Sequence, residues 1–102
     1  MGVARCENLE QIRERIDALD REIVSLLARR GEYVLQAAAF KRDAAHVRAP
    51  ARAATVIDNA GRLAEEAGAD RAVVERIYRE IVAAFTDAEL AAHVLKFSSQ
   101  QC

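Results

Sequence analysis

The sequence predicts an all-α protein made of three helices, the first of them long. Three observations support this fold class. Apolar residues recur at steps of three and four over most of the chain, which is the spacing of one helical face. Alanine, the strongest helix former, supplies 22 of the 102 residues. Only one proline and four glycines interrupt the pattern, and no segment reads as a strand.

The first helix is expected from about Asn8 to about Ala45. Asn8 and Gln11 have the spacing of a capping box at its start. Its apolar stripe consists of Leu9, Ile12, Ile16, Leu19, Ile23, Leu26, Leu27, Val34, Ala37 and Ala38. A helix of this length is long for a globular domain, and it indicates a coiled-coil-like or dimeric arrangement.

The second helix is expected from Pro50 to about Ala67, and the third begins after Asp70. Pro50 fits a first helical turn, because its missing N–H has no partner there in any case. Gly68 is a natural helix stop, and Asp70 is a good N-cap. The stripe of the third helix consists of Val73, Val74, Ile77, Ile81, Val82, Phe85, Ala88, Ala92 and Leu95.

Composition narrows the class of protein. The length fits a single domain, with frayed ends at about 1–7 and 97–102. A net charge of −1 offers no electrostatic footprint for nucleic acid or an anionic membrane. No apolar run has the length of a membrane span and no secretory signal is visible, so we expect a cytoplasmic protein. Large apolar residues are few, and dimerisation is a plausible remedy for the thin core.

The sequence lacks the residue patterns of metal, phosphate-loop and nucleophilic chemistry. Cys6 and Cys102 stand near the two ends and are expected to be free thiols. His46 and His93 have no metal-ligand or catalytic partner at a recognisable spacing, so we assign both to structure or surface. No cofactor is expected.

Two cations fall in the apolar stripe of the first helix. Arg30 takes the next stripe position after Leu26, and Lys41 follows 11 residues later. At about 100° per residue the two share one face, about 16 Å apart along the axis. Small residues lie between them, which describes a pocket for an anion with two negative ends. The alternative is that both side chains extend from the stripe edge to water or pair with acids of another helix.

Three further residues are candidates with ordinary alternatives. Arg13 lies beside the stripe near the start of the first helix, where it reaches the middle of a partner's helix in an antiparallel dimer, and otherwise it is solvated. Arg52 lies in the first turn after Pro50 and is otherwise surface charge. Glu89 lies at the edge of the third stripe and is otherwise part of a salt bridge or a solvated face.

These residues stand in an order and spacing that resembles the all-helical (type II) chorismate mutase family, including its isochorismate-pyruvate lyase branch. The matching text is LEQIRERIDALDREIVSLLARRGEYV, then FK, then RAPARA, then GADRAVVERIYREIVAAFTDAE. It covers roughly residues 9–93. The resemblance implies an intertwined homodimer, with each active site formed among helices of both chains, and a place in chorismate metabolism.

The resemblance also implies a role for each candidate residue. Arg13 reaches the site of the partner chain. Arg30 binds one substrate carboxylate, and Lys41 contacts the other carboxylate side and the ether oxygen. Arg52 is the arginine after the proline, and Glu89 stands where the family's third helix hydrogen-bonds the ether oxygen. The cations then face inward because a dicarboxylate is buried between helices.

The sequence departs from the family pattern at two positions. Many mutases carry a glutamate immediately after the arginine that follows the proline, where it contacts the C4 hydroxyl, and this chain has Ala53. That loss, and the spacing between Lys41 and Arg52, resemble the lyase branch. The family usually has glutamine at the position of Glu89. Unlike the glutamine amide, a glutamate can donate a hydrogen bond only when it is protonated.

The resemblance implies a unimolecular pericyclic reaction that needs no nucleophile, base, metal or cofactor. We expect chorismate mutase activity first, as the commoner activity of the family, and isochorismate-pyruvate lyase activity as the runner-up. An amino-substituted chorismate is a third option, and a non-catalytic helical dimerisation module is the alternative of another class. We expect faster turnover below neutral pH through protonated Glu89. We also expect loss of activity with little loss of fold in Lys41→Ala.

Overall fold

The computed structural model describes the backbone of residues 2–101 and the side chains of residues 2–94. It divides the chain into two compact units, Met1–Glu32 and Tyr33–Cys102. Within the described residues all regular structure is helical, which confirms the predicted fold class with its three long helices and long first helix. A fourth helix, only five residues long, was not expected.

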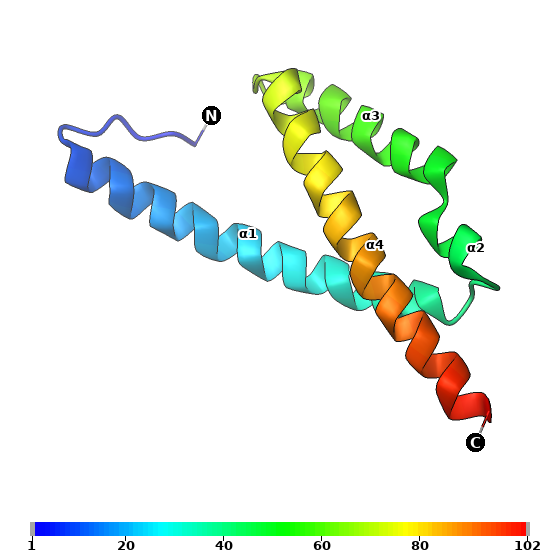
Figure 1. The fold of residues 1–102 in the computed structure, drawn as a ribbon. Coiled ribbons are helices and arrows are strands. Elements are labelled where there is room, and N and C mark those ends of the chain that lie inside the picture. The colour runs from blue at the N-terminus through cyan, green and yellow to red at the C-terminus, as the bar shows by residue number, and fades with distance from the viewer. Residues whose placement is uncertain (1, 102) are drawn as a thin grey trace. The chain divides into compact units, whose positions relative to one another are not determined.

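Helix α1 spans Leu9–Ala38 (Figure 1). The predicted cap is present, because the Gln11 N–H donates to Asn8 Oδ1 at 2.9 Å. The Gln11 side chain in turn accepts from the Glu7 N–H, also at 2.9 Å. These two bonds satisfy donors that a helix start leaves without intrahelical partners.

Helix α1 ends at Ala38, and the predicted extension to Ala45 is wrong. The N–H groups of Phe40 and Lys41 donate to the carbonyls three residues back, at 3.0 and 3.3 Å, which tightens the chain into a turn. Asp43 then starts helix α2, Ala44–Arg48, by accepting from the His46 N–H at 2.8 Å. The stripe continued through this segment, but a capping aspartate redirects the chain.

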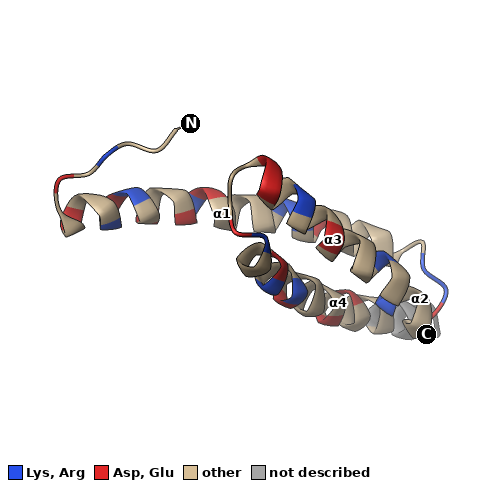
Figure 2. Cartoon of the chain, turned by 90° about the horizontal axis from the view of Figure 1, so that it is seen from above, with Lys and Arg blue, Asp and Glu red and all other residues tan. Residues whose placement is uncertain are grey.

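The part of α1 in the first unit leaves its large aliphatic residues uncovered. Six stripe residues are 43–57% exposed in the single chain. They are Leu9, Ile12, Ile16, Leu19, Ile23 and Leu26. Figure 2 shows acidic and basic residues along the other positions of this helix. Exposed aliphatic surface of this extent is typical of helix faces that pack against another element.

Helix α3 spans Pro50–Glu66 and helix α4 spans Arg71–Gln101. Pro50 lies in the first turn of α3, as predicted. Gly68 has a φ of 75° after the end of α3, which confirms its stop role. The Asp70 side chain accepts from the Ala72 N–H at 2.9 Å and caps α4. The side chains of the predicted frayed tail, 97–102, lie outside the described residues. The thiol of Cys102 lies outside them too.

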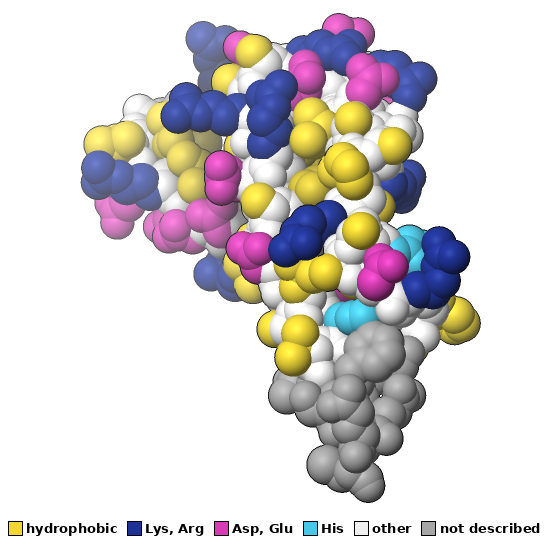
Figure 3. Space-filling view, turned by 45° about the vertical axis from the view of Figure 1, so that its right-hand side comes forward, with side chains coloured by type: hydrophobic (Ala, Val, Ile, Leu, Met, Phe, Trp, Pro, Cys, Tyr) yellow, Lys and Arg dark blue, Asp and Glu magenta, His cyan; other side chains and the backbone are white. Residues whose placement is uncertain are grey.

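The second unit is held by α3 and α4 lying side by side, with α2 also packed on α4 (Figures 1 and 2). The buried apolar residues here are small: Ala38, Val47, Ala60 and Ala64. Apolar side chains also reach the surface of this unit, where Figure 3 shows them gathered between charged ones. No large side chain of the described residues is fully buried, so a single chain has a thin core.

Arg71 joins the start of α4 to α3. Its guanidinium contacts Glu75, Glu65 and Asp58 at 2.9, 3.1 and 2.8 Å. Hydrogen bonds to Glu65 and then Glu75 raise the pKa of Arg71 above its ordinary value, so it stays charged throughout the neutral range. Gly61 makes room for this side chain, because a Cβ there would lie 2.7 Å from Arg71 Nε.

Two features, a membrane-spanning helix and a metal-binding cluster, are absent from the described residues. No helix in this part of the chain is long and apolar enough to cross a membrane. The same residues hold no group of three or more His, Cys, Asp or Glu side chains suited to a metal ion.

Candidate active site

An ion pair between Lys41 and Glu89 is the centre of the candidate site. Lys41 Nζ lies 2.8 Å from Glu89 Oε2. The residues come from different parts of the second unit, the turn after α1 and the middle of α4. Sequence analysis named both as candidates from separate helices, and the structure places them in direct contact.

Glu89 is unusual among the acidic residues because it is buried, at 5% exposed. It lies on the face of α4 that carries half-buried Phe85 and Val82, one and two turns earlier. Oε2 approaches the ammonium closely, yet it accepts no hydrogen bond of normal geometry. Burial disfavours a lone carboxylate and the ammonium favours it. The pair is therefore a compensated charge, with the carboxylate buried and the ammonium partly exposed.

The ion pair corrects one expectation. Lys41 is not an uncompensated cation, because the Glu89 carboxylate lies 2.8 Å from its ammonium. Removing the ammonium leaves a buried carboxyl group without its counter-charge, which costs stability unless that group takes up a proton. The expectation that Lys41→Ala leaves the fold untouched does not follow from this arrangement.

His93 holds the main chain at Lys41. Its Nε2 lies 2.8 Å from the Lys41 carbonyl oxygen, across 52 positions of sequence. His93 is 5% exposed, so the assignment to structure is supported and the surface alternative is not. The sequence shows that His93 lies four residues, about one helical turn, after Glu89. The contact of His93 with Lys41 could not be seen there, because it depends on α1 ending at Ala38.

Arg52 and Ala53 lie in the first turns of α3, in the second unit. The Arg52 side chain is exposed and Ala53 is half-buried. A methyl group at position 53 offers a ligand no hydrogen bond, whereas an exposed guanidinium is available to a carboxylate. Arg52 therefore meets a basic requirement for its predicted role.

Arg13 and Arg30 belong to the first unit, on α1. Arg13 is exposed and Arg30 is half-buried. The argument that Arg30 and Lys41 share one helical face is wrong, because Lys41 lies three residues beyond the end of α1. Their predicted common role now depends on the family pattern alone.

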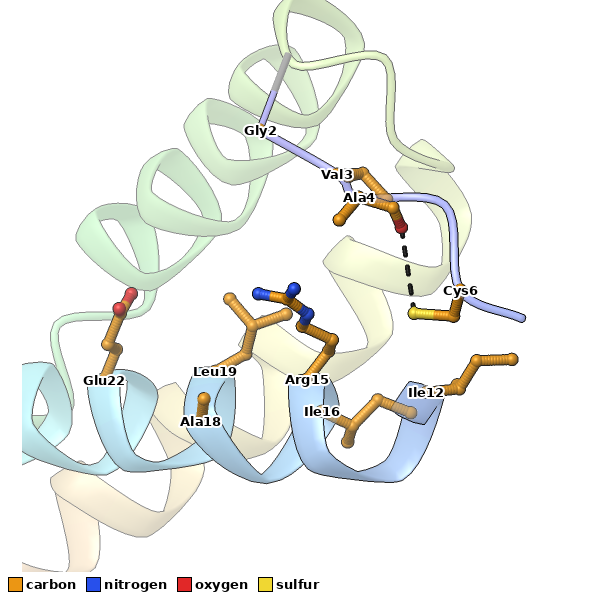
Figure 4. A pocket seen from close by; sticks show the side chains of 10 residues that line it. All are labelled: Gly2, Val3, Ala4, Cys6, Ile12, Arg15, Ile16, Ala18, Leu19 and Glu22. Carbon is orange, nitrogen blue, oxygen red and sulfur yellow. Dashed lines mark hydrogen bonds between the residues drawn. The ribbon is translucent and has the colours of Figure 1, made fainter. Parts of the chain in front are cut away.

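The first unit also contains a cavity of about 490 Å³, drawn in Figure 4. The extended segment before α1 passes over the apolar side of the helix and closes part of it (Figure 4). Its lining residues are Gly2, Val3, Ala4, Cys6, Ile12, Arg15, Ile16, Ala18, Leu19 and Glu22. None of the predicted site residues is among them, and several belong to the exposed aliphatic stripe. We therefore do not assign the reaction to this cavity.

Sequence reasoning missed two charged or polar centres. The Arg71 cluster joins residues from α3 and α4, and no local spacing pairs Asp58 with Arg71. The contact of His93 with Lys41 joins a side chain to a backbone carbonyl, which has no sequence signature. Both depend on tertiary packing.

Comparison with known proteins gives two findings. The family described as chorismate mutase type II matches residues 12–90. An isochorismate pyruvate lyase of Pseudomonas aeruginosa is 42% identical over 77 residues, which are 76% of this chain and 76% of that protein. The matched region contains Lys41 and Glu89, and it crosses from the first unit into the second.

Proposed function

Because this chain belongs to the type II chorismate mutase family, we propose that it catalyses a pericyclic reaction of a chorismate-like dicarboxylate. We propose isochorismate as the principal substrate, with salicylate and pyruvate as products. The observation that carries the proposal is the Lys41–Glu89 pair, a buried carboxyl group 2.8 Å from an ammonium. Such a pair can meet the ether oxygen at which negative charge develops.

The reaction needs positioning and charge stabilisation more than chemical participation by the protein. As the ether C–O bond of isochorismate breaks, a hydrogen moves from the ring to the enolpyruvyl carbon, pyruvate leaves and the ring becomes aromatic. Holding the enolpyruvyl chain folded over the ring removes part of the entropic barrier. Lys41 stabilises the negative charge on the departing oxygen, and Glu89 does so only in its acid form, which can donate a hydrogen bond. Arg30, Arg52 and the partner's Arg13 bind the carboxylates in this proposal.

Two observations favour isochorismate over chorismate. Ala53 stands where many mutases carry the glutamate that contacts the C4 hydroxyl, and the substrate of the lyases carries its hydroxyl elsewhere. The Pseudomonas aeruginosa relative is a lyase by name. Sequence analysis put the mutase first on the ground that it is the commoner activity. The relative reverses that order, and chorismate mutase activity becomes the second candidate.

We also propose that the working form is a homodimer. The stripe of α1 in the first unit exposes six large aliphatic side chains, and the single chain buries mainly alanine. A second copy of the same helix covers such a stripe by knobs-into-holes packing. Dimerisation then supplies the core that one chain lacks, and Arg13 reaches the partner's site. A single domain and a cytoplasmic location stay predictions.

The decisive experiment is product analysis with purified protein given isochorismate, chorismate and 4-amino-4-deoxychorismate separately, at pH 5 and pH 7.5. We expect salicylate and pyruvate from isochorismate as the fastest reaction. Faster formation of prephenate from chorismate makes the protein a mutase and Ala53 a tolerated loss. Faster rearrangement of the amino compound identifies the third option.

A matched binding experiment separates an enzyme from a non-catalytic dimerisation module. A dicarboxylate transition-state mimic binds only the folded protein, so it raises the melting temperature of an enzyme of this family. We expect a rise that is lost in Lys41→Ala. No rise in the wild-type protein, together with no turnover of any of the three substrates, favours the module.

A further inference from the structure

His93 is a buried titratable residue that the reaction proposed above does not use. Its Nε2 lies 2.8 Å from the carbonyl oxygen of Lys41. A carbonyl oxygen only accepts, so Nε2 carries the proton and donates. The bond connects α4 to the turn that follows α1, and it is made at the same residue whose ammonium forms the ion pair.

Helix α4 therefore contacts both the ammonium and the backbone carbonyl of Lys41. Glu89 and His93 are one helical turn apart, and each is 5% exposed. Glu89 Oε2 meets the ammonium and His93 Nε2 meets the backbone carbonyl, both at 2.8 Å. A lysine side chain has four rotatable bonds, so a bond at the ammonium does not by itself fix the backbone, whose N–H makes a long 3.3 Å bond to the Ala38 carbonyl. The bond from His93 places it.

The turn around Lys41 needs such a bond. Lys41 lies outside both α1 and α2, so its carbonyl has no place in a helical ladder. Its neighbours contribute little burial, because Phe40 is 83% exposed and Arg42 and Asp43 are exposed. The nearest buried apolar residues are Ala38 at the end of α1, three residues earlier, and Val47 in α2, six residues further on. His93 holds the segment at Lys41 itself.

We propose that His93 is a positioning residue for Lys41, an inference whose kinetic part rests on the proposed function. It keeps the Lys41 backbone in place when the ammonium turns from Glu89 toward the substrate. The ammonium acts on charge that develops in the transition state, so a loosened backbone lowers kcat. Substrate carboxylates are bound mainly by the arginines, so KM changes little.

The kinetic test compares His93→Leu with His93→Gln. Leucine removes the donor and keeps the apolar volume, whereas the glutamine amide can still donate to the carbonyl. We expect kcat to fall about tenfold in His93→Leu with KM within about twofold, and to recover to within about threefold of wild type in His93→Gln. Equal kcat in His93→Leu and wild type overturns the proposal. Equal losses in both variants, or a loss in KM alone, overturn it too.

A stability-matched control excludes a general loss of fold. Ala64→Gly lowers the helix propensity of a buried position on α3, a helix that contains none of the residues of the Lys41–His93 bond. We expect kcat of this control to stay within about twofold of wild type. If it falls as far as in His93→Leu, destabilisation alone explains the effect and the positioning role is wrong.

A second readout does not depend on activity, so the inference can be judged even if the proposed function fails. NMR of ¹⁵N-labelled histidine should show the Nε2–H tautomer of His93. Amide hydrogen exchange at Phe40 and Lys41 should rise at least tenfold in His93→Leu and stay near wild type in His93→Gln. An Nδ1–H tautomer, or unchanged exchange in His93→Leu, contradicts the bond and with it the inference.

Discussion

The two units of this chain differ in which side chains they expose and which they bury. The first unit exposes a row of large aliphatic residues on α1, whereas the second buries alanine and valine and ties its helices with charged contacts. Its Lys41–Glu89 pair is formed within one chain. Two of the three arginines expected to bind the substrate carboxylates, Arg13 and Arg30, are in the first unit, and Arg52 is in the second.

The difference suggests a division of labour. The second unit makes the charged centre by itself, so that centre should tolerate loss of the dimer better than the complete site does. In our proposal a second copy covers the stripe of the first unit, and the same association brings Arg13 to the partner's site. Changes that affect one unit but not the other can test this division.

Breaking the stripe should have the largest effect. Ile16→Glu places a charge in the middle of the exposed aliphatic row, where burial against a second copy becomes unfavourable. We expect loss of the dimer in analytical ultracentrifugation and a fall in turnover of more than about a hundredfold, because the site then lacks its partner arginine.

Ser25→Glu is the matched control for this change. Ser25 is exposed on the opposite side of α1, so the same charge is added away from the stripe. We expect a dimer with near-native turnover. A dimer of normal affinity in Ile16→Glu contradicts the proposed interface.

Removing the ammonium should have the next largest effect. Lys41→Ala should lower kcat by about a hundredfold or more, since it removes the charge that meets the ether oxygen. It should also lower the melting temperature, because Glu89 loses its counter-charge, and Glu89→Gln in the same protein should restore much of that loss. Near-native turnover in Lys41→Ala contradicts the site assignment. Arg42→Ala removes the same charge at the neighbouring residue and should leave kcat unchanged.

A smaller effect is expected at Glu89. If the acid form donates to the ether oxygen, wild-type turnover rises between pH 7.5 and pH 5, and Glu89→Gln, which donates at every pH, flattens the profile. Initial rates at constant ionic strength across this range measure it. The same pH profile in both proteins removes Glu89 from the proton-donating role.

The smallest effect concerns stability alone. In the wild-type chain, Gly61→Ala should lower the melting temperature, because the new Cβ displaces an Arg71 side chain held by three carboxylates. In an Arg71→Ala background the same change should raise it, since alanine is the better helix former by about 1 kcal/mol. A double-mutant cycle by calorimetry measures the coupling. Effects of equal sign in both backgrounds contradict the tight fit.

The helices could be predicted from sequence because their signals are local. Asn8, Pro50, Gly68 and Asp70 act at the positions where the spacing placed them. The end of α1 was missed because the stripe of small residues continues through a turn that Asp43 redirects. Alanine is compatible with either course, so periodicity has little power there.

The site was predicted in part, for the same physical reason. Family spacing identified Lys41 and Glu89, but their contact depends on α4 packing against the turn after α1. The bond from His93 depends on the same packing and involves a backbone atom. The prediction that Arg30 and Lys41 share one helical face was wrong, because Lys41 lies beyond the end of α1.

Complementation between inactive chains tests the division of labour most directly. Arg13→Ala and Lys41→Ala are co-expressed with different affinity tags, and kcat per chain is measured with isochorismate or with the fastest substrate found. Random pairing makes half of the dimers mixed, each with one intact site of two, so about one quarter of wild-type activity should return. Activity no higher than that of the separate variants means that Arg13 does not act across the dimer and contradicts the account.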